Sequence, residues 1–152
     1  MNTWLGVELK SAREALGMSQ KELARALHNP VTDAQYRDTR ISEAERGLRP
    51  VPDWLPEQIT ALEQARDSLA ETALEMWELW EKTSDGEEDV PECVFIVHES
   101  NKTLWQAHPE MRDKIPAVVQ RVATALAVAQ IEEETGQRPR IVPWIPPSNI
   151  SE

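Results

Sequence analysis

The chain is poor in cysteine and has no long apolar segment. Among its 152 residues there is one cysteine, Cys93, which excludes an internal disulfide framework and fits a reducing compartment. No stretch reaches the roughly 18 apolar residues that a membrane-spanning helix needs. The first residues mix acids and bases from Glu8 onward, which is unlike a signal peptide. We therefore expect a cytoplasmic protein with no membrane segment.

Signatures of catalysis and of metal binding are also missing. The five glycines stand singly, so no glycine-rich loop can hold a phosphate, and neither GxSxG nor HExxH occurs. Cys93, His98 and His108 do not have the spacing of zinc ligands. We therefore expect a protein that is not an enzyme and that needs neither a metal nor a cofactor.

Acidic charge is distributed unevenly along the chain. The formal net charge is -11, yet residues 1–50 hold eight Lys or Arg against seven Asp or Glu. The excess acid therefore lies in residues 51–152. A nearly neutral N-terminal part can still present a locally basic face to a polyanion, because binding responds to the charge that is close to the ligand.

Two short helices are expected near the N-terminus. The apolar residues of segment 7–16 fall largely on one side of a helix, and Gly17 has the position of a C-terminal glycine stop. Ser19 precedes Glu22 by three residues, which is the pattern of a capping box. A second helix is therefore expected from Gln20 to about residue 27.

A third helix has two possible starts. Thr32 with Gln35 forms one capping-box pair, whereas Asp38 is an equally good N-cap for a shorter helix. Both versions end at Gly47, which is again placed as a C-terminal stop.

A long helix and a small mixed segment follow. Apolar residues alternate at spacings of four and three from Asp53 to Lys82, interrupted only at Arg66, and an unbroken helix here measures about 45 Å. The polar stretch that comes next is typical of a linker. Beyond it we expect a strand over Cys93–Val97, a buried helix opened by Pro116 and stopped by Gly136, and a second strand over Arg140–Ile145 before a proline-rich tail.

The N-terminal pattern resembles a known class of DNA-binding domain. The segments LKSAREALGMSQKELARAL and RISEAERGLRPVP are similar to the two halves of the lambda-repressor-like, or Xre-type, helix-turn-helix domain, over about residues 5–56. The C-terminal part loosely resembles the dimerisation regions of phage-borne and anti-CRISPR-associated regulators. The implied fold is mainly α, with a helix-turn-helix bundle in residues 1–56, a long connecting helix in 57–83, an acidic linker in 84–91 and a small α+β dimerisation region in 92–152.

The resemblance implies a sequence-specific regulator that binds double-stranded DNA. Gln20 and Lys21 open the second helix, where side chains and free N–H groups can hold a phosphate. With Ile41 and Ala44 turned inward, the polar side of the third helix is left for the major groove. The residues expected at the DNA are Ser19, Gln20, Lys21, Tyr36, Arg37, Asp38, Thr39, Arg40, Ser42, Glu43, Arg46 and Arg49.

Arginines are the expected base readers. Arginine can donate two hydrogen bonds to guanine O6 and N7, so Arg40 is the leading candidate and Arg37 the next. The connection before the third helix is longer than the family norm, which can carry Arg37 onto the DNA backbone instead. Glu43 stands where the family often has a basic residue, and its carboxylate can accept from a cytosine amino group or orient a neighbouring arginine. The resemblance also implies an internal salt bridge between Arg13 and Glu45.

Binding as a homodimer is expected because operators read by such domains usually have two half-sites. We expect a repressor that covers an inverted repeat. The residues expected at the dimer interface are Leu62, Leu69, Ala73, Met76, Trp77, Trp80, Val122 and Leu126.

Other interpretations remain open at the level of sequence. The long apolar stripe also fits a helix in the core of its own chain. The acidic C-terminal half also fits an antitoxin-like interaction protein that binds a basic protein partner, and a single copy can instead read an asymmetric site.

Overall fold

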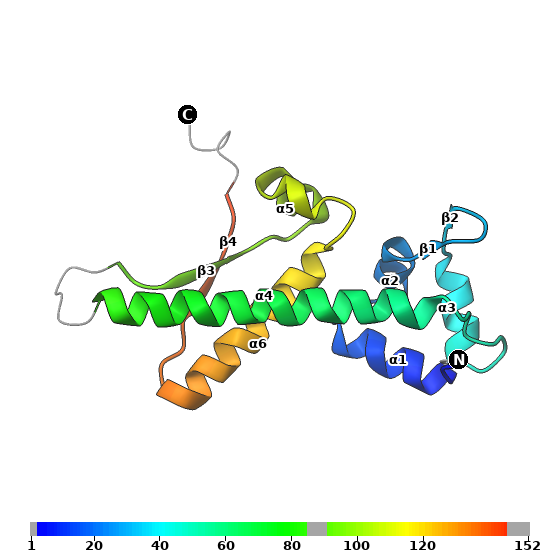
Figure 1. Ribbon diagram of the computed structural model, residues 1–152, viewed down its shortest axis with the longest axis horizontal. Helices are drawn as coiled ribbons and strands as arrows, with labels where there is room; N and C mark the ends of the chain where they lie inside the picture. The colour runs from blue at the N-terminus through cyan, green and yellow to red at the C-terminus, as the bar shows by residue number, and fades with distance from the viewer. Residues whose placement is uncertain (1–2, 85–90, 146–152) are drawn as a thin grey trace. The chain divides into compact units, whose positions relative to one another are not determined.

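The computed structural model describes residues 3–84 and 91–145, and the chain divides into an N-terminal unit, residues 1–65, and a C-terminal unit, residues 66–152. The N-terminal unit contains α1 (Gly6–Ala15), α2 (Gln20–Ala26), β1 (His28–Asn29), β2 (Ala34–Gln35), α3 (Asp38–Glu45) and the start of α4 (Leu55–Ser84) (Figure 1). The C-terminal unit contains the rest of α4, then β3 (Val94–Val97), α5 (Asn101–Ala107), the 3-10 helix η1 (Pro109–Met111), α6 (Ala117–Thr135) and β4 (Arg140–Pro143).

Both α1 and α3 stop at the glycines that the sequence indicated. Gly17 and Gly47 have φ angles of 70° and 76°, a left-handed conformation that a residue with a side chain rarely adopts. At the end of α3 the Leu48 N–H donates to the Glu43 carbonyl at 2.8 Å. This bond satisfies a carbonyl that the helix leaves unpaired and turns the chain sharply, so the predicted stops are confirmed.

A short antiparallel hairpin that the sequence did not predict joins α2 to α3. His28 of β1 lies opposite Gln35 of β2. The earlier of the two expected starts for the third helix is therefore wrong, because Thr32 lies between the strands. Helix α3 begins at Asp38, and its N-cap is Arg37 rather than Asp38 as we expected.

Helices α1, α2 and α3 pack closely around an apolar core. The helices approach closely at Gly6, where an added Cβ would lie 2.2 Å from the carbonyl oxygen of Ala44 and 2.9 Å from that of Glu45. Only a residue without a side chain fits between α1 and the α3 backbone at this point. The largest fully buried side chains of this unit are those of Leu9, Leu16, Leu23, Leu27, Ile41, Leu55 and Ile59.

Helix α4 is unbroken over 30 residues, which the interruption of the apolar spacing at Arg66 had left open. It begins at Leu55 and ends at Ser84, within two residues of the expected bounds. The expected acidic linker, residues 84–91, falls mainly on residues 85–90, which lie outside the described residues, as does the proline-rich tail.

The C-terminal unit contains a two-stranded parallel sheet formed by β3 and β4, with Phe95 opposite Ile141 (Figure 1). Both expected strands are confirmed, as is the helix that ends at Gly136, whereas α5 and η1 were not predicted. No helix within residues 3–84 and 91–145 has the length and apolar character needed to cross a membrane. One apolar cluster in the core of this unit consists of Ala73, Trp77, Phe95, Ala127, Val128 and Ile131.

Each edge of this small sheet is partly closed. The backbone N–H and C=O groups of successive strand residues point to opposite edges of the strand. On the edge of β3 that faces β4, the Val97 carbonyl accepts a hydrogen bond from the Trp144 N–H at 2.9 Å. On the other side of β3, the Gln120 amide of α6 donates to the Ile96 carbonyl at 2.9 Å and accepts from His98 N–H at 3.3 Å. On the outer side of β4, Pro143 offers no N–H, a feature that disfavours pairing with a further strand.

Candidate nucleic-acid interface

The N-terminus of α2 is fixed by a reciprocal pair of hydrogen bonds. Ser19 Oγ accepts from the Glu22 backbone N–H at 3.1 Å, and the Glu22 carboxylate accepts from the Ser19 N–H at 3.0 Å. The predicted capping box is therefore confirmed. Lys21 is exposed on this first turn, whereas Gln20 is half-buried and turns toward α3.

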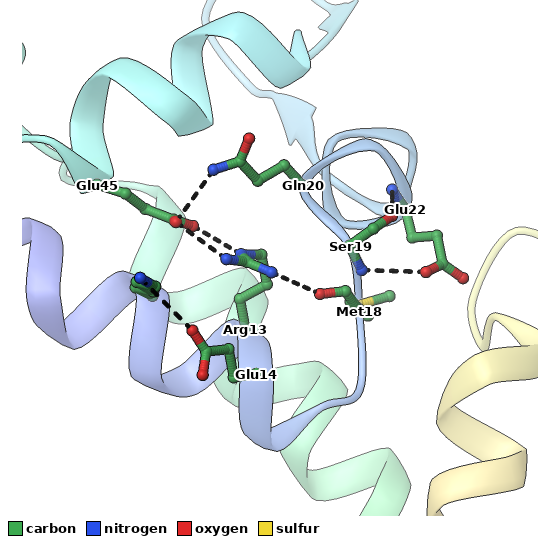
Figure 2. A network of polar contacts seen from close by, with 8 residues as sticks. Arg13, Glu14, Met18, Ser19, Gln20, Glu22 and Glu45 are labelled. Carbon is green, nitrogen blue, oxygen red and sulfur yellow. Dashed lines mark hydrogen bonds and ion pairs between the residues drawn. The ribbon is translucent and has the colours of Figure 1, made fainter.

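A polar network ties the three helices of this region together (Figure 2). Arg13 of α1 donates to both carboxylate oxygens of Glu45 on α3, at 2.7 and 3.0 Å, and to the Met18 carbonyl at 2.9 Å. Gln20 of α2 donates to the same carboxylate at 3.1 Å. The salt bridge that the family resemblance implied is therefore present, with side chains that are 12% and 4% exposed.

The Glu45 carboxylate is held in its charged form. Burial acts to raise its pKa, but the hydrogen bonds from Arg13 and Gln20, together with the charge of Arg13, outweigh burial and place the pKa below its ordinary value. The Glu45 hydrogen bond likewise raises the pKa of Arg13. A charged bidentate pair of this kind fixes the orientation of α3 against α1.

Helix α3 has a buried apolar side and an accessible polar side. Ile41 and Ala44 are buried, as predicted. Arg37, Arg40 and Arg46 make no ion pair within the described part of the chain, so their guanidinium groups are available to a ligand. Of the residues expected at the DNA, Ser19, Lys21, Arg37, Thr39, Arg46 and Arg49 are exposed, and Gln20, Tyr36, Asp38, Arg40, Ser42 and Glu43 are half-buried.

Glu43 forms an ion pair with Arg49, which follows the turn at the end of α3. The pair places a carboxylate and a guanidinium together on the accessible side of α3. Burial raises the pKa of the nearby Tyr36, whose ring meets Trp54 edge-on with centroids 5.1 Å apart. Tyr36 therefore acts partly as a packing residue.

Two residues at this site were not identified from the sequence. Trp54 supports Tyr36, and Gln58 of α4 forms two hydrogen bonds with the backbone of His28. Both contacts join residues far apart in the chain, so no local motif could have indicated them.

The residues expected at a dimer interface differ in how far they are exposed to solvent. Met76 and Leu126 are 54% and 48% exposed, whereas Leu69, Trp80 and Val122 are half-buried. The remaining three, Leu62, Ala73 and Trp77, are buried in their own chain.

The chain was compared with known protein families. Residues 4–75 match the model of a family described as a helix-turn-helix domain. The chain carries a helix-turn-helix domain. The matched residues include α1, α2, the hairpin, α3 and much of α4, so the helix-turn-helix domain contains the Arg13–Glu45 network and the polar side of α3. No match to this chain was found among curated proteins.

Proposed function

We propose that this protein is a transcriptional regulator that places α3 in the major groove of double-stranded DNA. The observation that carries the proposal is the helix-turn-helix domain in residues 4–75, in which α3 has one buried side and one accessible side, with arginines that make no ion pair to any residue the structure describes. The major groove of B-DNA admits an α-helix, and each base pair presents a distinct set of donors and acceptors there.

The polar residues take different roles at the DNA. Arg40 is the main base reader and Arg37, at the start of α3, the second, because arginine can bind guanine with two hydrogen bonds. Lys21 and Arg46 contact phosphates and fix the register of the domain. Of the two roles expected for Glu43, its ion pair with Arg49 favours that of orienting an arginine.

A homodimer that forms through helices supplies two such domains. Met76 and Leu79 of α4 and Leu126 of α6 are large apolar residues that are 54%, 63% and 48% exposed. At 3.6 residues per turn, Glu71 and Glu78 lie on the opposite side of α4 from Met76, so two copies can meet at Met76 without bringing these acids together.

The partly closed sheet edges support the same mode of association. Gln120 covers part of the β3 edge and Pro143 interrupts the outer edge of β4, which disfavours a dimer built by joining two sheets. Helical faces are therefore the surfaces left for a second copy. We propose an Xre-type repressor that acts in the cytoplasm by covering an inverted repeat as a dimer.

Selection of bound duplexes from a random DNA pool tests this function. We expect enrichment of an inverted repeat, and light scattering of the free protein at the mass of a dimer. An asymmetric enriched site and a monomer would overturn the dimeric mode. If no duplex is retained at low ionic strength, the proposed function is wrong.

A further inference from the structure

The connection between α2 and α3 is a folded element rather than a loose loop. Asn29 Oδ1 accepts from the backbone N–H of Val31 at 2.9 Å and of Thr32 at 3.3 Å, and the Asp33 N–H donates to the Asn29 carbonyl at 2.9 Å. His28 Nε2 lies 2.7 Å from the Asp33 carboxylate. These bonds hold β1 and β2 together in a closed hairpin (Figure 1).

One side chain attaches this hairpin to α4. The Gln58 amide accepts from the His28 backbone N–H at 2.9 Å and donates to the His28 carbonyl at 2.6 Å. The Gln58 side-chain amide thus bonds both the N–H and the C=O of His28, as the backbone of a neighbouring strand would. The other end of the hairpin is fixed close by, where the Tyr36 ring meets Trp54 just before α4 begins.

The hairpin is poorly suited to bind the phosphate backbone. Residues 28–36 contain no Lys or Arg, and the charged residue between the strands is Asp33, which phosphate would repel. Val31 is 86% exposed at the turn, and β2 ends at Gln35, two residues before Arg37, the N-cap of α3. The position of the hairpin directly before α3 therefore indicates that the hairpin determines where α3 begins.

We propose that Gln58 is a positioning residue for α3, which holds the hairpin so that α3 enters the major groove at a fixed point and angle. The inference rests on the proposed function of DNA binding. Without the two hydrogen bonds, the segment between Leu27 and Arg37 samples more conformations. The conformational entropy of that segment is then lost only when DNA binds, and this loss weakens the affinity for DNA.

The test compares Gln58→Ala with Gln64→Ala in the full chain, because Gln64 is an exposed glutamine on the same helix. Binding to the duplex chosen from the random pool is measured well below the melting temperature. We expect Gln58→Ala to bind about tenfold more weakly, the size expected when about one net hydrogen bond is lost. Gln58→Glu retains the acceptor for His28 N–H, but its second carboxylate oxygen faces the His28 carbonyl and its charge repels phosphate, so it should bind no more tightly than Gln58→Ala.

A second measurement is independent of DNA. Hydrogen exchange at the His28 amide should be faster in Gln58→Ala than in wild type or Gln64→Ala, because the bond to Gln58 is its protection. Equal exchange contradicts the attachment itself. Equal DNA affinity of Gln58→Ala and Gln64→Ala, with wild type binding tightly, overturns the positioning role alone. A wild-type protein that retains no duplex overturns the proposed function and with it the positioning role.

Discussion

Arg13 and Arg40 are arginines of the same domain whose surroundings give them different roles. Arg13 is enclosed by Glu45 and the Met18 carbonyl, whereas Arg40 is half-buried on the polar side of α3 without an ion pair in the described residues. Arg13 therefore stabilises the fold, and we assign Arg40 to DNA recognition.

We predict that Arg13→Ala lowers both thermal stability and DNA affinity. Its removal leaves Glu45 buried without its main partner, and the loss of one partner of a buried pair costs about 3 kcal/mol of unfolding free energy. Arg40→Ala should leave the melting temperature unchanged and weaken binding by about tenfold or more. Thermal denaturation and duplex titration of both variants check this division, and equal thermal losses in the two would refute it.

His98 predicts a pH dependence of stability in the C-terminal unit. It is 2% exposed, and its Nδ1 has no hydrogen-bond partner among the described residues. Burial, with a smaller contribution from His108, lowers the pKa of His98 below its ordinary 6.5. The unfolded chain therefore takes up this proton first as the pH falls, so the free energy of unfolding declines below about pH 6.5.

Denaturant unfolding of the C-terminal unit at several pH values measures this effect. The decline should be smaller in His98→Gln, whose side chain does not titrate. His28→Gln serves as the control, because His28 is exposed and belongs to the N-terminal unit. A wild-type decline that His98→Gln leaves unchanged would assign the effect to other groups.

At the scale of elements, the contact between α1 and α3 depends on a missing side chain. Gly6→Ala normally favours a helix by up to about 1 kcal/mol. Here the added Cβ would meet the Ala44 carbonyl at 2.2 Å, so we predict a net loss of about 1–3 kcal/mol. Ser11→Ala, at an exposed site on α1, controls for helix propensity. A melting temperature of Gly6→Ala at or above that of wild type would contradict the close packing.

The elements that the sequence predicts are those whose signals are local. Ser19 with Glu22, Gly17, Gly47 and the long apolar alternation of α4 each determine structure within a few residues, and all of them are confirmed. The hairpin and α5 are short and carry no periodic pattern. The hairpin depends on Gln58, which lies 30 residues from His28 in the chain, so local reasoning could not find it.

The candidate site was predictable to a similar extent. The polar side of α3 follows from the inward positions of Ile41 and Ala44, which fix the rotation of the helix. The apolar stripe of α4 was harder to interpret, because periodicity does not distinguish a core of the same chain from a partner. Trp77 is buried against Phe95 and α6 in its own chain, whereas Met76 next to it is exposed.

At the scale of the whole molecule, charge separates the two parts of the chain. The formal net charge of -11 arises in residues 51–152, and the N-terminal residues that we place at the DNA include five basic side chains, namely Lys21, Arg37, Arg40, Arg46 and Arg49. Acid elsewhere repels phosphate and leaves one face able to dock. We therefore expect weak binding to unrelated sequences and an affinity that falls steeply with salt, with a slope near -0.9 per phosphate contact.

The most direct test of the central claim, that α3 reads base edges, is the affinity of wild type and Arg40→Ala for the selected duplex and for a scrambled duplex across a salt series. The account predicts that wild type prefers the selected duplex. Arg40→Ala should keep its affinity for the scrambled duplex, with a similar salt slope, and lose most of the preference. An Arg40→Ala variant with the full preference of wild type, or a wild type that binds neither duplex at low ionic strength, would contradict the account.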